Sequence, residues 1–156
     1  MSGEEGRVRR RTVAEVEAGQ EFGPLVVDVD RPRLVAYAAA SGDHNRIHWD
    51  EAFARSVGLP DVIAHGMWTM GAAAELVADW AGDPAAVVDV RTKFTAPVVV
   101  PWEGGAKIEV RGTVKKVTSA AESAPASALV DLAVTCDGEK VLTRAQAVVL
   151  LAADAG

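Results

Sequence analysis

The sequence predicts an α+β fold in which an antiparallel sheet wraps around one long apolar helix. Residues 66–81 are apolar on nearly every side and rich in Ala and Gly, which is typical of a helix that is buried over most of its surface. The second half of the chain is rich in Val and Thr and, in residues 107–115, alternates polar and apolar side chains as half-buried strands do. A twisted sheet that wraps around the helix would bury it best.

The first half of the chain is expected to supply one strand and several short helices. A helix should begin near Asp30 or at Arg31-Pro32, because Asp caps helix N-termini and Pro is tolerated in the first turn. Gly42 should end this helix, since glycine enters left-handed backbone conformations without steric cost. The other predicted elements of this half are a helical turn at 12–19, a strand at 25–29 and a short helix at 50–58.

The second half is expected to form an antiparallel meander. Asp137-Gly138 is a strong hairpin signal between two strand-like segments. Pro97 and Pro101 should limit ladder pairing near the end of the first segment, because proline has no N–H to donate. The predicted strands cover residues 87–100, 107–115, 128–135 and 140–151, with a loop at 119–125.

Length and composition indicate one soluble domain. The chain has 156 residues, 49% of them hydrophobic and 24% charged, which is ordinary for a globular protein with its own core. We expect residues 1–11 to be a flexible N-terminal tail and residues 12–156 to be the domain. The net charge of −6 argues against a nucleic-acid partner. The single Cys136, the lack of an apolar leader and the lack of a long apolar run favour the cytoplasm and no membrane contact.

Residues 41–50, SGDHNRIHWD, concentrate polar groups on an irregular segment after a predicted helix end. Asp43 and His48 can reach a common point if the segment curls, which gives an acid/base pair that works near neutral pH. Asp, Asn and Ser are also ordinary turn formers, so a purely local role is the alternative reading. Residue chemistry favours the functional reading only slightly.

A second candidate segment, Ala64-His65-Gly66-Met67, opens the long helix. The first-turn amides of a helix have no intrahelical partner, and the helix dipole favours negative charge there. Gly66 would let a substrate oxygen approach its N–H, and that N–H would stabilise an enolate-type oxyanion. The alternative is that Gly66 only permits a tight turn and that His65 anchors the loop.

These segments resemble the MaoC-like (R)-specific enoyl-thioester hydratases and dehydratases, and over most of the chain the HadB-type catalytic subunits of (3R)-hydroxyacyl-ACP dehydratase. The resemblance rests on YAAASGDHNRIH at 37–48, on IAHGM at 63–67 and on later matches at 80–84 and 91–98. It implies a hot-dog fold whose central helix spans residues 66–81. One position departs from the family pattern: Arg46 stands where Pro is usual, which predicts a less preorganised loop.

The resemblance also implies the roles of the site residues. Asp43 and His48 would be the catalytic pair and Asn45 would help to hold the site. The Gly66 amide would contact the oxyanion. Ile63 and His65, in the same segment, are predicted to lie at the substrate-binding part of the site.

The activity implied is reversible hydration of trans-2-enoyl thioesters to (3R)-hydroxyacyl thioesters, in the dehydratase step of type II fatty-acid elongation. Alternatives are a homodimeric (R)-specific enoyl-CoA hydratase of a degradative, polyester or polyketide pathway, a non-catalytic acyl-binding subunit, and a thioesterase. No metal is expected, because three His and one Cys show no zinc spacing, and no cofactor is implied either. The expected partners are an acyl-CoA or acyl-ACP substrate, with acyl carrier protein possible. We also expect a homodimer, or a heterodimer with a second hot-dog subunit.

Overall fold

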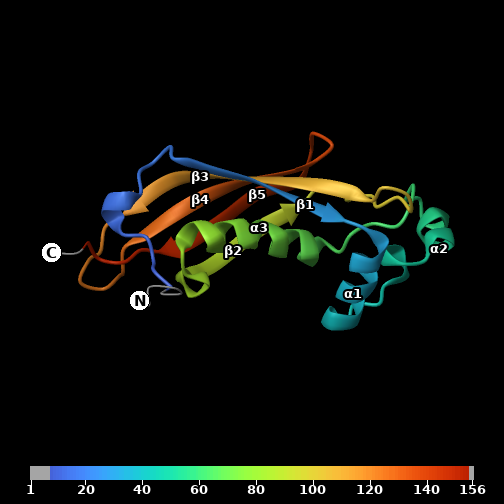
Figure 1. Ribbon diagram of the computed structural model, residues 1–156, viewed down its shortest axis with the longest axis horizontal. Helices are drawn as coiled ribbons and strands as arrows, with labels where there is room; N and C mark the ends of the chain where they lie inside the picture. Colours follow the sequence, from blue (N-terminus) through green and yellow to red (C-terminus); the bar gives the residue numbers. More distant parts are fainter. Residues whose placement is uncertain (1–7, 155–156) are drawn as a thin grey trace, which may run out of the picture.

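Five antiparallel strands form one sheet that lies along a single long helix (Figure 1). The computed structural model describes residues 8–154. The strands are β1 (Glu21–Val29), β2 (Val87–Phe94), β3 (Ala106–Thr118), β4 (Ser127–Cys136) and β5 (Glu139–Leu150), in the order β1-β3-β4-β5-β2. The helices are α1 (Arg31–Ser41), α2 (Glu51–Ser56) and α3 (Gly66–Ala81), with 3-10 turns η1 (Val13–Glu15), η2 (Arg46–His48) and η3 (Pro84–Ala86). This is the predicted hot-dog arrangement.

Helix α3 has the predicted bounds and provides one side of the core. Its C-terminus is closed by Gly82 in the left-handed conformation, at φ 77°. Its buried residues are Thr69, Ala72, Ala73, Leu76, Val77, Trp80 and Ala81. The helix is not buried on most sides, however: Met67, Gly71 and Glu75, which follow one another at four-residue spacing, are exposed. The many small residues therefore serve close packing against the sheet on one face only.

Helix α1 ends where the sequence predicted, and its end aims the next segment toward α3. The Asp30 side chain accepts a hydrogen bond from the Arg33 N–H at the N-terminus, and Gly42 adopts φ 75° at the C-terminus. In Figure 1, α1, the turn after it and α2 lie together at one end of the sheet, near the start of α3. The polar segment of residues 41–50 therefore emerges beside the first turn of α3.

Strand β2 is shorter than expected. The predicted strand of residues 87–100 ends at Phe94, and residues 95–100 leave the sheet. The Val98 carbonyl accepts from the Ala64 N–H at 2.9 Å, and the Val62 carbonyl accepts from the Val100 N–H at 2.9 Å. This segment therefore binds the backbone that leads into α3, in keeping with the two prolines that limit its pairing within the sheet.

The β4–β5 hairpin confirms the turn read from the sequence. Asp137 and Gly138 occupy the turn with φ values of 50° and 80°. Two successive positive φ values are the signature of a type I′ turn, whose twist matches that of the flanking strands. Residues 119–125, predicted as a loop, lie between β3 and β4.

Part of the predicted N-terminal tail packs against the domain. The Arg10 side chain donates to Asp83 at 2.6 Å, and the Arg11 side chain donates to the Trp80 carbonyl. The Arg11 backbone also pairs with Ala81 and Ala152. For these residues the structure shows ordered contacts where the sequence predicted a flexible tail, and residues 1–7 of that tail lie outside the described part. Within residues 8–154, no helix combines the length and apolar character that a membrane span requires.

Candidate active site

A chain of side-chain caps shapes the polar segment after α1. The Asp43 Oδ1 accepts from the Asn45 N–H at 3.1 Å, and the Asn45 Oδ1 accepts from the Ile47 N–H at 3.2 Å, which caps η2. The Asp50 Oδ1 then accepts from the Phe53 N–H at 3.0 Å and caps α2. These residues favour caps and turns because their short side chains bond to nearby backbone groups. The segment therefore curls, which is the condition for bringing Asp43 and His48 together.

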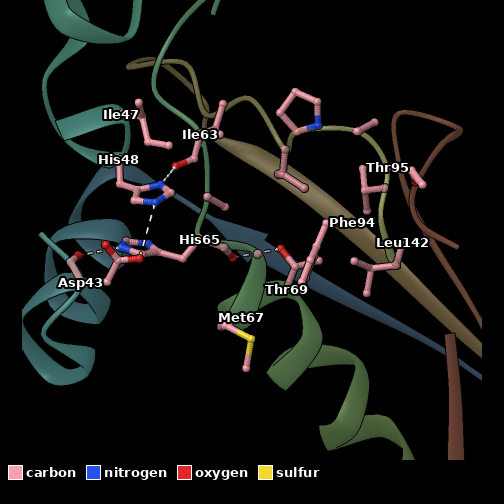
Figure 2. Close-up of a pocket in the computed structure, with 16 residues that line it drawn as sticks. Asp43, Ile47, His48, Ile63, His65, Met67, Thr69, Phe94, Thr95 and Leu142 are labelled. Atoms are coloured by element: carbon pink, nitrogen blue, oxygen red, sulfur yellow. Dashed lines mark hydrogen bonds and ion pairs between the residues drawn. The ribbon is translucent and has the colours of Figure 1, made fainter. Parts of the chain in front are cut away.

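His48 is held in one tautomer by the backbone. Its Nδ1 lies 2.7 Å from the Ile63 carbonyl oxygen, which can only accept a hydrogen bond. Nδ1 therefore carries the proton, and in the neutral ring Nε2 keeps its lone pair. This Nε2 lies 3.8 Å from the Asp43 Oδ2 (Figure 2). That separation is too long for a direct hydrogen bond but leaves room for a water oxygen about 2.8 Å from both atoms.

The surroundings of His48 favour its neutral form. Burial lowers the pKa of the His48 imidazole below its ordinary value of 6.5, and the nearby His65 lowers it further. The hydrogen bond to the Ile63 carbonyl and the Asp43 carboxylate act in the opposite direction without reversing the effect. His48 is therefore a neutral base at pH 7. The Asp43 carboxyl, by contrast, keeps about half of its side chain exposed.

The pair faces a mostly apolar cavity of about 500 Å³. Its polar side is formed by Asp43, His48, His65 and the first residues of α3. The opposite wall comes from two later segments, residues 94–98 and the start of β5, through Phe94, Thr95, Ala96, Pro97, Val98, Val141 and Leu142. An apolar pocket with a few convergent polar groups is the usual form of a small-molecule site.

Gly66 brings the first amide of α3 to the cavity. It is the first residue of the helix and lines the cavity, and its N–H has no backbone acceptor among the described residues. The positive end of the helix dipole adds to the pull of this amide on an anion. A Cβ at position 66 would lie 2.9 Å from the Cδ1 and Cε1 atoms of Phe94. Glycine therefore allows the close approach of the Phe94 ring, and a Cβ here would displace that ring.

Five of the six residues predicted for the site line the cavity: Asp43, His48, Ile63, His65 and Gly66. Asn45 does not, and its side-chain oxygen is used in capping η2. Ile63 contributes its carbonyl to His48, a role that its apolar side chain does not reveal in the sequence. Sequence reasoning missed the wall at 94–98 and 141–142. The signals near it were Pro97, which limits pairing in that stretch, and the family resemblance at 91–98, to which no site role was assigned.

Asp43, His48 and His65 place possible metal-ligand atoms within 4.8 Å of one another, but their geometry does not suit a metal ion. The two imidazole rings are stacked, with centroids 3.7 Å apart and an interplanar angle of 20°. The lone pair of an imidazole nitrogen lies in the ring plane, and two nearly parallel planes separated in this way do not meet at one ion, as the ligands of a metal must.

Arg46, the departure from the family pattern, points away from the cavity. Its guanidinium donates to the Asp50 carboxylate at 2.6 Å and lies 4.5 Å from the centre of the Phe53 ring. The side chain therefore links η2 to the first turns of α2. This contact restrains the same segment in which the loss of Pro predicted more freedom.

Comparison with known proteins shows the family of the chain. The family model described as the MaoC-like domain matches residues 12–129. The 3-hydroxybutyryl-CoA dehydratase of Methylorubrum extorquens is 32% identical over 127 residues, which cover 80% of this chain and 74% of that protein. The chain thus belongs to the MaoC-like family.

The chain spans less than a third of one further relative and less than half of one similar solved structure. The 3-hydroxyacyl-thioester dehydratase X of Mycobacterium tuberculosis is 41% identical over 80 residues, 51% of this chain but only 28% of that protein. A structure described as a MaoC-like dehydratase aligns with a TM-score of 0.86 and 36% identity over 92% of this chain and 43% of its own. The R-hydratase PhaJ1 of Pseudomonas aeruginosa, at 23% identity and a TM-score of 0.77 over 94% of this chain and 89% of its own, shares the fold.

Proposed function

We propose that this chain is a hydro-lyase that interconverts trans-2-enoyl and (3R)-hydroxyacyl thioesters. One observation carries the proposal: a neutral His48 with a free Nε2 lone pair and the Asp43 carboxyl face each other at 3.8 Å on the wall of an apolar cavity. Family membership and the dehydratase names of the relatives support the same reaction class.

In the hydration direction, a water molecule lies between Asp43 and His48. As the water oxygen bonds to C3 of the enoyl group, the pair takes one proton from it, and the pair returns one proton to C2. The sum is water added across the double bond, and the pair as a whole holds the same number of protons before and after. The two side chains lie on the same side of the cavity, so both new bonds form on one face of the substrate.

The thioester oxygen gains negative charge while C2 is an enolate carbon. The Gly66 N–H at the start of α3 is placed to stabilise that charge, because it faces the cavity and lacks a backbone acceptor in the described structure. The apolar wall of Phe94, Val98 and Leu142 surrounds the acyl group and limits the access of bulk water to the enolate.

For the biological setting, we propose the dehydratase step of type II fatty-acid elongation. The 41% identity to a 3-hydroxyacyl-thioester dehydratase over the stretch that matches supports it. The main alternative is an enoyl-CoA hydratase of a degradative, polyester or polyketide pathway, favoured by the more complete match to a 3-hydroxybutyryl-CoA dehydratase. We further propose a dimer, since β1 and β2 are the edge strands of the sheet formed by one chain.

The test is hydration of crotonyl-CoA by the purified protein, with Asp43→Asn and His48→Gln as variants. We expect activity in the parent and a fall of at least about a hundredfold in kcat in each variant, since each removes one proton-transfer group. His44→Gln, on the same loop but exposed, is the matched control and should keep full activity.

Three measurements separate the alternatives. Equal activity of the parent and the Asp43 and His48 variants would reject the reaction assignment. A thioesterase would release free thiol, whereas a hydro-lyase conserves the thioester. A higher kcat/KM for crotonyl linked to acyl carrier protein than to CoA would support the elongation step, and the reverse preference would support the CoA pathways.

A further inference from the structure

We propose that His65 is a positioning residue that holds both members of the Asp43–His48 pair at once. It orients the His48 ring by stacking on it and fixes the Asp43 main chain by a hydrogen bond. This inference rests on the proposed hydro-lyase reaction and adds a third side chain to its machinery.

His65 lies between two aromatic rings at the start of α3. It is 2% exposed. The His48 ring stacks on one side, with centroids 3.7 Å apart and planes inclined by 20°. Tyr37 of α1 meets it edge-on, with centroids 4.8 Å apart and planes inclined by 60°. The plane of His48 is therefore set by a ring that is itself held by α1.

The hydrogen bond of His65 reaches the other member of the pair. Its Nε2 lies 3.1 Å from the Asp43 carbonyl oxygen, which only accepts, so Nε2 carries the proton. The other hydrogen bonds of Asp43 in the described structure are local, to Ser41 and Asn45. His65 is thus the hydrogen-bonding partner that ties the Asp43 backbone to α3, as Figure 2 shows.

The remaining ring nitrogen of His65 lowers the stability of the folded state. With the proton on Nε2, Nδ1 is a bare acceptor, and it is buried with no partner among the described residues. A buried acceptor without a donor destabilises the folded state. An apolar side chain of similar shape would avoid that cost, so packing alone does not account for a histidine at this position.

The electrostatic environment of His48 also depends on this contact. The groups that face the His48 ring are the Asp43 carboxylate, the Ile63 carbonyl and the His65 ring, while the nearby Arg46 is paired with Asp50. Of these, His65 lowers the pKa of His48. Removal of the His65 imidazole should therefore move the acid limb of the pH profile of kcat/KM to higher pH. The reason is that His48 would keep its proton up to a higher pH.

Two substitutions separate the contacts. His65→Gln keeps an N–H donor near the position of Nε2 but loses the ring face, and His65→Phe keeps the ring face but loses the donor. We expect each to lower kcat at least tenfold, with a KM change of less than about threefold, and to shift the acid limb upward. His44→Gln, an exposed histidine replacement on the same loop, should change neither quantity.

Wild-type kcat and an unshifted acid limb in both His65 variants would overturn the proposal. So would a loss of stability with full activity in the folded fraction, which is the signature of a purely structural residue. NMR titration of the His48 ring provides a readout without substrate: we expect its pKa to rise in both variants. If the parent hydrates neither crotonyl-CoA nor crotonyl linked to acyl carrier protein, the reaction assignment fails. An unchanged pKa of His48 would separately refute its coupling to His65.

Discussion

Gly66→Ala tests whether the first amide of α3 contacts the substrate. The added Cβ would lie 2.9 Å from two carbon atoms of the Phe94 ring. Ordinary carbon contacts are about 3.5–4.0 Å, so the ring must move by roughly 0.6–1 Å. Phe94 is 53% exposed and can swing toward solvent. Because Ala also favours helix by up to about 1 kcal/mol over Gly, we expect the free energy of unfolding to stay within about 1 kcal/mol of the parent.

The activity should respond far more than the stability. A methyl group beside the amide and a displaced Phe94 ring would both hinder the thioester oxygen from reaching the N–H. Loss of one oxyanion donor costs about a hundredfold to a thousandfold in kcat. We expect kcat for crotonyl-CoA hydration to fall at least tenfold, with the unfolding free energy measured in urea on the same preparations.

Gly71→Ala is the matched control on the same helix. Gly71 is exposed, and a Cβ there meets nothing within 4 Å, so this variant should be more stable by about 0.5–1 kcal/mol and fully active. Equal kcat in the two alanine variants would refute the role of the Gly66 amide. Full recovery on adding Phe94→Ala to Gly66→Ala would assign the loss to the displaced ring alone.

Three further predictions concern stability. Because the pKa of His48 is lowered from 6.5 in the folded protein, the unfolded chain binds a proton at a higher pH than the folded one. The contribution of His48 to the free energy of unfolding should therefore be complete above about pH 6.5 and fall as the pH drops below it. Urea titrations between pH 5 and 8 should show this dependence in the parent and not in His48→Gln. Gly112→Ala would place a methyl group on the Phe22 ring, which stacks on Trp80, so urea denaturation should show a loss of about 1–3 kcal/mol, partly restored by Phe22→Leu. Arg46→Pro removes an exposed ion pair worth about 0.2–1 kcal/mol but restricts the unfolded chain by a similar amount, and Asn45 already has the ψ of 128° that suits a residue before proline. The free energy of unfolding of this variant, measured in urea, should match that of the parent. A drop of several kcal/mol would show that the Arg46 side chain holds the loop.

Local signals in the sequence predicted the elements that carry the candidate catalytic residues. The bounds of α3, the Asp30 and Gly42 caps of α1 and the Asp137-Gly138 turn all depend on backbone preferences of single residues, which act over a few positions. The proximity of Asp43 and His48 was predictable for the same reason, because the loop between them is closed by the capping side chains of Asp43 and Asn45.

Local signals in the sequence could not predict the contacts between residues far apart in the chain. Nothing near Ile63 indicates that its carbonyl would bind His48, and nothing near Leu142 indicates a place on the cavity wall. The exit of residues 95–100 from the sheet depends on hydrogen bonds to Val62 and Ala64, more than 30 positions earlier in the chain. The stripe of exposed residues on α3 likewise depends on which face the sheet covers, which the near-uniform apolar composition of that helix does not show.

The cavity is built from two parts of the chain, and this affects how the specificity for the acyl group can change. The proposed proton-transfer groups and the Gly66 amide all come from residues 43–66, whereas the opposite wall comes from residues 94–98 and 141–142. The proposed reactive groups and the opposite wall thus come from separate stretches of the chain. Substitution of wall residues that do not touch Gly66, such as Val98 and Leu142, would change the acyl groups that fit the cavity while leaving the proposed reactive atoms in place.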